Sequence, residues 1–278
     1  MRMRIVLMLA VACAGCGGGG ADDGETTVVA SFYPLAYAAE EVAGDTARVR
    51  NLTPPGAEPH DLEVSPQDVQ SLRDADLVLL LGDGFQPQLE DAAGDGEPVV
   101  HALDTPGLRR LEGGDPHVWL DPLRYASVVE RIGDALGRPE AATRLVGRLQ
   151  SLDGEYRSGL ADCARRDIVT SHEAFAYLAA RYGLTQIPIT GLSPEAEPAP
   201  RDLERAVEAV RETGATTVFV EPLLSTRAAE TVAREAGVRT AVLNPIEGLT
   251  ASEEERGEDY FTLMRANLAA LRKALSCR

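Results

Sequence analysis

Three of the four histidines in this sequence lie just after predicted β-strands, where their side chains can meet. His60 follows the second predicted strand, His117 follows the fourth, and His172 directly follows the fifth. Ligands of open parallel α/β sheets bind beyond the carboxyl ends of the strands, so these positions favour one shared site. Three imidazoles without a thiol suit zinc well, and the pattern therefore predicts a metal site. The fourth, His101, falls within a predicted strand and is interpreted as a structural or surface residue.

A carboxylate is expected to complete the ligand set. Glu247 is preferred, because it lies just past the end of the last predicted strand. Glu58, shortly before His60, is an alternative, and Asn244 could contribute a carbonyl oxygen. The residues alone leave these alternatives open.

The elements that would position these side chains are eight short β-type runs in two sets of four. The runs are Thr27–Phe32, Ala47–Leu52, Leu77–Leu81, Pro98–Leu103, Asp167–Ser171, Gln186–Thr190, Thr217–Val220 and Thr240–Leu243. They alternate with helical patterns at Pro66–Ala75, Asp202–Thr213 and Arg227–Ala236. Strands alternating with helices predict an α/β fold with two lobes, each a mostly parallel four-stranded sheet flanked by helices.

A long helical stretch separates the two sets of strands. Asp121 and Pro122 begin it with a cap and a proline at the first position, and Pro139 restarts it after a break. The second helix, Pro139–Asp162, would be roughly 35 Å long and is predicted to join the lobes as a rigid backbone. A last helix is expected at about Glu255–Ser276.

The first residues have the layout of a secretory signal. Arg2 and Arg4 precede a short apolar run, which ends in Ala14-Gly15-Cys16 before a glycine-rich stretch. This pattern resembles the lipobox of bacterial lipoproteins, so we expect cleavage before Cys16 and lipid attachment to it. Cys13 is a weaker candidate, and an ordinary cleaved signal is the alternative. The mature chain is expected outside the cytoplasm, anchored by lipid to the cell membrane.

The expected division of the chain follows from these observations. It comprises a signal peptide (1–16), a flexible tether (17–26), an N-terminal lobe (27–138), the linking helix (139–162) and a C-terminal lobe (163–278). Cys163 and Cys277 are the only cysteines after Cys16, and in an oxidising compartment we expect them to form a disulfide. Two free thiols are the alternative.

Composition excludes some classes of partner. The 278 residues are 44% hydrophobic, which is enough to bury a core, and acids outnumber bases by 44 to 27. The formal net charge of −17 argues against nucleic acid or an anionic membrane surface as the main partner, since both need a cationic face.

The motifs together resemble one known family, the solute-binding lipoproteins of bacterial zinc and manganese ABC transporters. The matching segments are Pro55–Asp61, Ser65–Asp68, Ala75–Gly82, Asp115–Pro122, Ser171–Gly183, Gly191–Glu195 and Asn244–Gly248. The resemblance implies two α/β lobes bridged by a helix, with one metal ion held between them by His60, His117 and His172. It places the fourth, variable ligand at the Asn244–Glu247 turn or near the first histidine. It also implies an ABC permease as partner, and we expect a monomer.

Two departures from the family pattern bear on the metal. Many zinc members carry a long loop rich in histidine and acids before the second histidine, but Thr105–Gly114 is short and contains no histidine. Asn244 stands where manganese members tend to have a ligand aspartate, so we expect Zn²⁺ as the transported ion, with Mn²⁺ as the alternative.

The rival classes are an extracellular zinc hydrolase and an adhesin with incidental metal. His172-Glu173 begins like the His-Glu-x-x-His motif, but Ala176 stands where the second histidine is needed. A site closed by four protein ligands also lacks the open position that catalysis requires. The chain is therefore not expected to be an enzyme.

Overall fold

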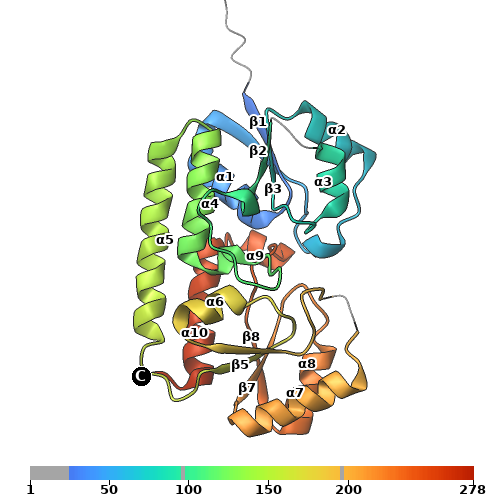
Figure 1. Ribbon diagram of the computed structural model, residues 1–278, viewed down its shortest axis with the longest axis vertical. Helices are drawn as coiled ribbons and strands as arrows, with labels where there is room; N and C mark the ends of the chain where they lie inside the picture. Colours follow the sequence, from blue (N-terminus) through green and yellow to red (C-terminus); the bar gives the residue numbers. More distant parts are fainter. Residues whose placement is uncertain (1–24, 95–97, 195–196) are drawn as a thin grey trace, which may run out of the picture.

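The chain folds into two α/β lobes that lie one above the other beside a long helix, α5 (Pro139–Gly159; Figure 1). The computed structural model describes residues 25–94, 98–194 and 197–278. The signal peptide, Cys16 and nearly all of the expected tether lie outside these residues. Within the described ranges, no helix is long and apolar enough to cross a membrane.

The first sheet has four parallel strands, and one of its two central strands is buried on both faces. It contains β1 (Thr26–Ala30), β2 (Ala47–Asn51), β3 (Leu77–Leu80) and β4 (Val99–His101), all parallel, in the order β2-β1-β3-β4. Leu77 and Leu79 pack toward α1 (Tyr33–Ala43), whereas Val78 and Leu80 pack toward α2 (Pro66–Asp74) and α3 (Pro87–Ala93). Such a strand reads as a continuous apolar run. Thr26, which we expected in the tether, pairs with Ala47 in this sheet.

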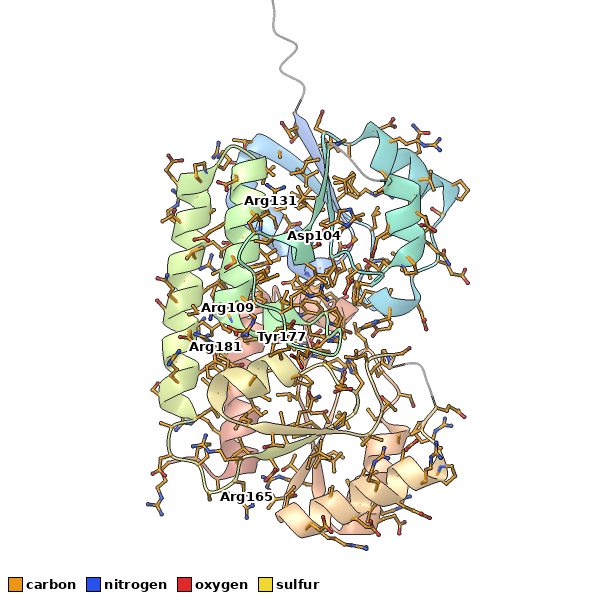
Figure 2. The ribbon with its side chains drawn as sticks, in the orientation of Figure 1. Asp104, Arg109, Arg131, Arg165, Tyr177 and Arg181 are labelled. Atoms are coloured by element: carbon orange, nitrogen blue, oxygen red, sulfur yellow. A yellow bond between two sulfur atoms is a disulfide. The ribbon has the colours of Figure 1, made fainter. Side chains whose placement is uncertain are left out.

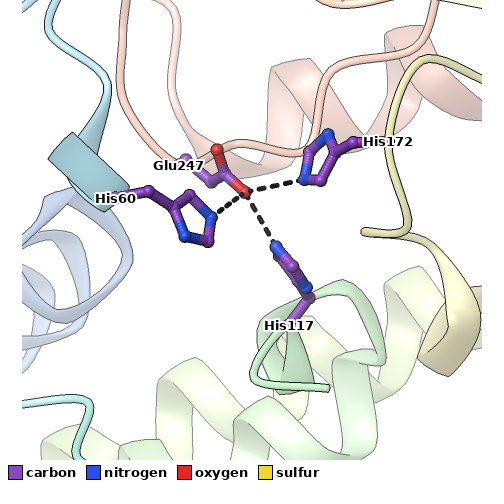
Figure 3. A group of neighbouring side chains, drawn as sticks. All are labelled: His60, His117, His172 and Glu247. Atoms are coloured by element: carbon purple, nitrogen blue, oxygen red, sulfur yellow. Dashed lines mark hydrogen bonds and ion pairs between the residues drawn. The ribbon is translucent and has the colours of Figure 1, made fainter. Parts of the chain in front are cut away.

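The second sheet repeats the same topology. It contains β5 (Asp167–Thr170), β6 (Thr185–Pro188), β7 (Thr217–Val220) and β8 (Arg239–Val242), all parallel, in the order β6-β5-β7-β8. The helices α6 (Ala176–Tyr182), α7 (Pro200–Thr213) and α8 (Arg227–Ala236) belong to this lobe. The predicted fold class is confirmed, and the loops that follow β2, β4, β5 and β8 meet between the lobes (Figures 1 and 3).

Capping side chains and glycines determine several helix ends. Asp121 caps α4 (Pro122–Ala135) by accepting hydrogen bonds from the amides of Leu123 and Arg124, at 2.9 and 3.4 Å. The expected last helix is wrong at its start, because Gly257 has a φ of +66° and interrupts it. A short helix, α9 (Ala251–Glu255), ends before this glycine, and α10 (Tyr260–Leu275) begins after it with Asp259 as its cap.

The two lobes share one continuous hydrophobic core. Tyr260 of α10 packs against Tyr37 of α1 and Tyr125 of α4, with ring centroids 5.9 and 4.8 Å apart. Buried residues of α5, including Leu149 and Tyr156, belong to the same cluster. Separating the lobes widely would expose this apolar surface, at about 25 cal/mol per Å².

Cys163 and Cys277 form a disulfide that joins the segment after α5 to the end of α10. Their separation of 114 residues means that the bond closes a long loop of the unfolded chain. In the chain-entropy account, such a loop contributes on the order of 4 kcal/mol to stability. The disulfide expected from the compartment and the cysteine count is thus present in the fold.

An ion-pair network centred on the buried Asp153 connects α5 with α6. Asp153 of α5 accepts hydrogen bonds from Arg181 Nε at 2.6 Å, Tyr182 Oη at 3.1 Å and Arg157 Nε at 2.9 Å. Arg181 Nε also lies 3.1 Å from Asp121, the cap of α4 (Figure 2). Burial alone would raise the pKa of Asp153, but the hydrogen bonds from the two arginines outweigh burial and lower it.

This network predicts a pH-dependent contribution to stability. Because the pKa of Asp153 is lower in the folded chain, its contribution is fully present above the ordinary aspartate pKa of about 3.9 and is lost as the pH falls below it. We expect Asp153→Asn to lower the free energy of unfolding by about 1–3 kcal/mol at pH 7. Urea denaturation at pH 7 and pH 3 measures this, and an equal difference at both pH values would contradict it.

Candidate metal centre

Four side chains from both lobes meet in one buried cluster, and they are the four that the sequence favoured (Figure 3). The Nε2 atoms of His60, His117 and His172 lie 3.5, 2.9 and 3.5 Å from Oε1 of Glu247. All four candidate ligand atoms lie within 4.8 Å of one another. His117 and His172 are 0% exposed and Glu247 is 1% exposed, while the His60 side chain is 13% exposed.

Short turns within the loops that follow β2 and β4 hold the two histidines of the N-terminal lobe. His60 lies in a single 3-10 turn, Pro59–Asp61, where Glu58 accepts a hydrogen bond from its amide at 3.4 Å. His117 precedes a similar turn, Val118–Leu120. Short turns with proline entries leave the backbone little freedom, so the imidazoles start from defined positions.

The turn that carries Glu247 is strained and firmly held. Ile246 has a φ of +59°, which is unusual for a β-branched residue. Its amide donates to Oδ1 of Asn244 at 2.8 Å, and Asn267 bonds both the amide and the carbonyl of Asn244, at 2.8 and 2.6 Å. Such strain persists only where surrounding contacts over-determine it, and it is common at ligand sites.

Two further carboxylates stand behind the histidine rings. Oδ1 of Asp115 accepts a hydrogen bond from the amide of His117 at 2.8 Å and lies 2.7 Å from its Nδ1. In the C-terminal lobe, Oε1 of Glu221 accepts from the amide of His172 at 3.1 Å, and Oε2 lies 2.6 Å from Nδ1. Both acids are buried, and both face the ring nitrogen that points away from Glu247.

The acidic and imidazole groups of this cluster shift one another's pKa values. Burial lowers the pKa of an imidazole, but contacts with Asp115 and Glu247 raise that of His117, and contacts with Glu221 and Glu247 raise that of His172 to about 10. Burial would raise the pKa of Glu247, yet the three histidines hold it well below its usual range. The cluster therefore attracts positive charge.

The geometry suits a small tetrahedral cation. Zinc bonds of about 2.0–2.1 Å place the four ligand atoms of a tetrahedron about 3.3–3.4 Å apart. The contacts between Glu247 and the three imidazoles, 2.9–3.5 Å, bracket this spacing. Nε2 of His60, Nε2 of His172 and Oε2 of Glu247 are buried without a hydrogen-bond partner among the described residues. Buried polar atoms are normally satisfied, so these three indicate a ligand.

The two alternative fourth ligands lie close to the cluster but differ in their contacts. Oδ1 of Asn244 already accepts a hydrogen bond from Ile246 and its carbonyl accepts one from Asn267 of α10, which argues against a ligand role. Glu58 has a buried oxygen without a partner, and burial together with the charge of Glu247 raises its pKa to about 9. His101 ends β4 and lies outside the cluster.

The contact of Glu221 with His172 was not predicted from the sequence, and Asp115 was named there only as part of a motif. Glu221 directly follows β7, the strand beside β5, so its place at the carboxyl edge was the available signal. The role of Trp119 was also missed. Its Nε1 donates to the carbonyl of Pro245 at 2.7 Å, and its own carbonyl accepts from Tyr260 Oη at 2.6 Å.

These contacts join the ligand loops of the two lobes independently of any ion. Trp119 reaches the turn of Glu247, and the amide of Gly56 donates to the carbonyl of Leu249 at 2.7 Å. Tyr177 of α6 donates from its hydroxyl to the carbonyl of Asp115 at 3.2 Å (Figure 2 labels Tyr177). The Glu247 turn is thus tied to the loops of His60 and His117.

We expect Trp119→Phe to loosen the Glu247 turn, because it leaves the buried carbonyl of Pro245 unpaired. The free energy of unfolding should fall by about 1–3 kcal/mol, and zinc affinity measured by calorimetry should fall with it. Tyr260→Phe is the matched control, since it removes a donor to Trp119 but keeps the bond to Pro245. Equal zinc affinity in Trp119→Phe and wild type would contradict the coupling.

Comparisons with known proteins agree with this geometry. Residues 28–274 match the family model described as "Zinc-uptake complex component A periplasmic". The zinc-binding lipoprotein AdcA of Streptococcus pneumoniae is 36% identical over 97% of this chain, which spans 60% of the length of AdcA. The high-affinity zinc uptake system protein ZnuA of Bacillus subtilis is 32% identical, covering 89% of this chain and 87% of that protein.

A solved structure supports the same relationship. The Zn(II)-bound ZnuA-like domain of Streptococcus pneumoniae AdcA superposes with a TM-score of 0.78 and 37% identity, covering 91% of this chain and 99% of that domain. The family match extends over nearly the whole described chain, and it includes all four residues of the cluster. This chain belongs to the family of the periplasmic component A of zinc-uptake complexes.

Proposed function

We propose that this chain is the extracytoplasmic zinc-binding component of an ABC transporter. It captures Zn²⁺ between its lobes through His60, His117, His172 and Glu247, and it delivers the ion to a permease in the cytoplasmic membrane. The observation that carries the proposal is the buried cluster of three imidazole nitrogens around one carboxylate oxygen, with atoms that lack other partners. Family membership supports the transport role.

The donor set favours zinc over manganese. When they bind an ion the three imidazoles are neutral, so together with one carboxylate they give one negative charge and mostly nitrogen donors, which zinc accepts in a compact four-coordinate shell. Manganese is a harder ion that prefers more oxygen ligands and lies low in the affinity series. The oxygens of Asn244 accept hydrogen bonds from Ile246 and Asn267, so they do not add to the donor set.

A hydrolase or an adhesin with incidental metal fits these observations less well. A four-ligand closed shell leaves no open coordination position for a catalytic water. AdcA and ZnuA bear names of zinc-binding and zinc-uptake proteins. A similar structure, the laminin-binding protein of Streptococcus agalactiae, is titled a bifunctional protein with adhesin and metal transporting activity, so its metal is not incidental. If the chain were a hydrolase, the purified zinc-loaded protein would hydrolyse test substrates. If it were an adhesin with incidental metal, its deletion would leave growth in zinc-poor medium unchanged.

The ligand set predicts the metal preference of a variant. His172→Glu replaces a nitrogen donor with oxygen, so zinc affinity should fall markedly while relative manganese affinity rises. His172→Ala should weaken zinc binding without improving manganese binding. Competition titration against a chelator measures both ions. Displacement of zinc by manganese at comparable free concentrations in the wild type would contradict the assignment.

We propose further that the mature chain acts as a monomer anchored to the outer face of the membrane, or in the periplasm, through a lipid on Cys16. The Ala14-Gly15-Cys16 sequence after a short apolar run supports the anchor. The name of AdcA as a lipoprotein is consistent with it. The acidic net charge gives no support to nucleic acid as a partner.

We expect Cys16→Ala to release the chain from the membrane fraction, because the variant lacks the thiol that carries the lipid. Fractionation and labelling with a radioactive fatty acid measure this. Cys13→Ala is the matched control and should remain labelled and membrane-bound. Unchanged labelling of the Cys16 variant would rule out this anchor.

A further inference from the structure

Glu221 is a buried acid that contacts one candidate ligand at two points. It directly follows β7 and is 2% exposed. Its Oε1 accepts the hydrogen bond from the amide of His172 at 3.1 Å, while Oε2 lies 2.6 Å from Nδ1 of the same residue. Glu221 is not one of the four clustered residues, so its contact with the cluster passes through the His172 ring.

Other contacts already hold the backbone of His172. Its carbonyl accepts hydrogen bonds from Thr170 Oγ1 at 2.8 Å and from Gln186 Nε2 at 2.9 Å. The hydroxyl of Ser171 donates to the carbonyl of Phe219 at 3.1 Å, which ties the end of β5 to β7. The loop therefore keeps its place without the ring contact, and the distinct contribution of Glu221 is to the imidazole.

The N-terminal lobe contains a related arrangement, in which the contact with the ring is a hydrogen bond, whereas the contact of Glu221 with Nδ1 of His172 is an ion pair. Asp115 contacts both the amide and Nδ1 of His117, at 2.8 and 2.7 Å. The two acids reach their histidines by different routes, since Asp115 comes from the same loop and Glu221 from the neighbouring strand. A carboxylate contacts Nδ1 of a histidine in both lobes, although it comes from a different element in each. This indicates that the orientation of these rings matters for the site.

We infer that Glu221 is a positioning residue that presents Nε2 of His172 to the metal and tunes the site toward zinc. A carboxylate that accepts the Nδ1 proton fixes the tautomer and leaves the Nε2 lone pair free. Its charge also makes the imidazole a stronger donor. Zinc gains more from a strong nitrogen donor than manganese does, so Glu221 favours zinc selectivity. This inference rests on the proposed function.

The test compares Glu221→Ala, Glu221→Gln and wild type by competition titration with zinc and with manganese. The zinc dissociation constant should rise about 10–100-fold in Glu221→Ala, with a smaller change for manganese. Glu221→Gln should recover part of the loss, because its amide oxygen can still accept the Nδ1 proton. If Glu221→Ala does not fold, Glu221→Gln against wild type decides the matter.

Asp153→Asn is the matched control, since it also removes a nearly buried carboxylate but lies in the network between α5 and α6. It should lower stability and leave zinc affinity unchanged. Wild-type zinc affinity in both Glu221 variants, or an equal loss for zinc and manganese, would overturn the inference. A wild-type chain that fails to bind zinc would instead overturn the proposed function.

Discussion

The structure depends on one contact, between the Glu247 carboxylate and the three imidazoles around it. A carboxylate that is 1% exposed carries a large desolvation cost unless positive charge or a metal ion compensates it. The compensation comes from histidines of both lobes, 2.9–3.5 Å away. The two sheets must therefore present their carboxyl edges to each other, and the helices that hold them in that relation become part of the site.

That requirement explains the surrounding polar architecture. Asp115 and Glu221 contact the far sides of two rings, and Trp119 holds the turn of Glu247 through the carbonyl of Pro245. The strained φ of Ile246 is sustained by the hydrogen bond that its amide donates to Asn244 Oδ1 and by the bond from Asn267 to the carbonyl of Asn244. Each contact removes freedom from a ligand loop, which lowers the entropic cost of assembling four ligands around one ion.

Much of this could be predicted from sequence because its signals are local. The buried run Leu77–Leu80 and the caps Asp121 and Ser65 mark their own elements, and the candidate ligands follow from the rule of strand ends. The contact between Glu221 and His172 could not be assigned, because it depends on β7 lying beside β5, and the strand order is not a local property of the sequence. The bond from Trp119 to Pro245 joins residues 126 positions apart, which no local pattern reveals. The break at Gly257 was overlooked although glycine signalled it.

The core shared by the two lobes has a consequence for how long an ion stays bound. Because Tyr260, Tyr125 and the helix α5 belong to one packed cluster, wide parting of the lobes would break apolar contacts far from the ion. Exit is less costly through movement of single loops, and the partly exposed His60 is the most accessible of the four side chains. The residence time is then governed by the local unfolding free energy of a few residues. Under the proposed function, a permease that binds one ligand loop would shorten the residence time without separating the lobes.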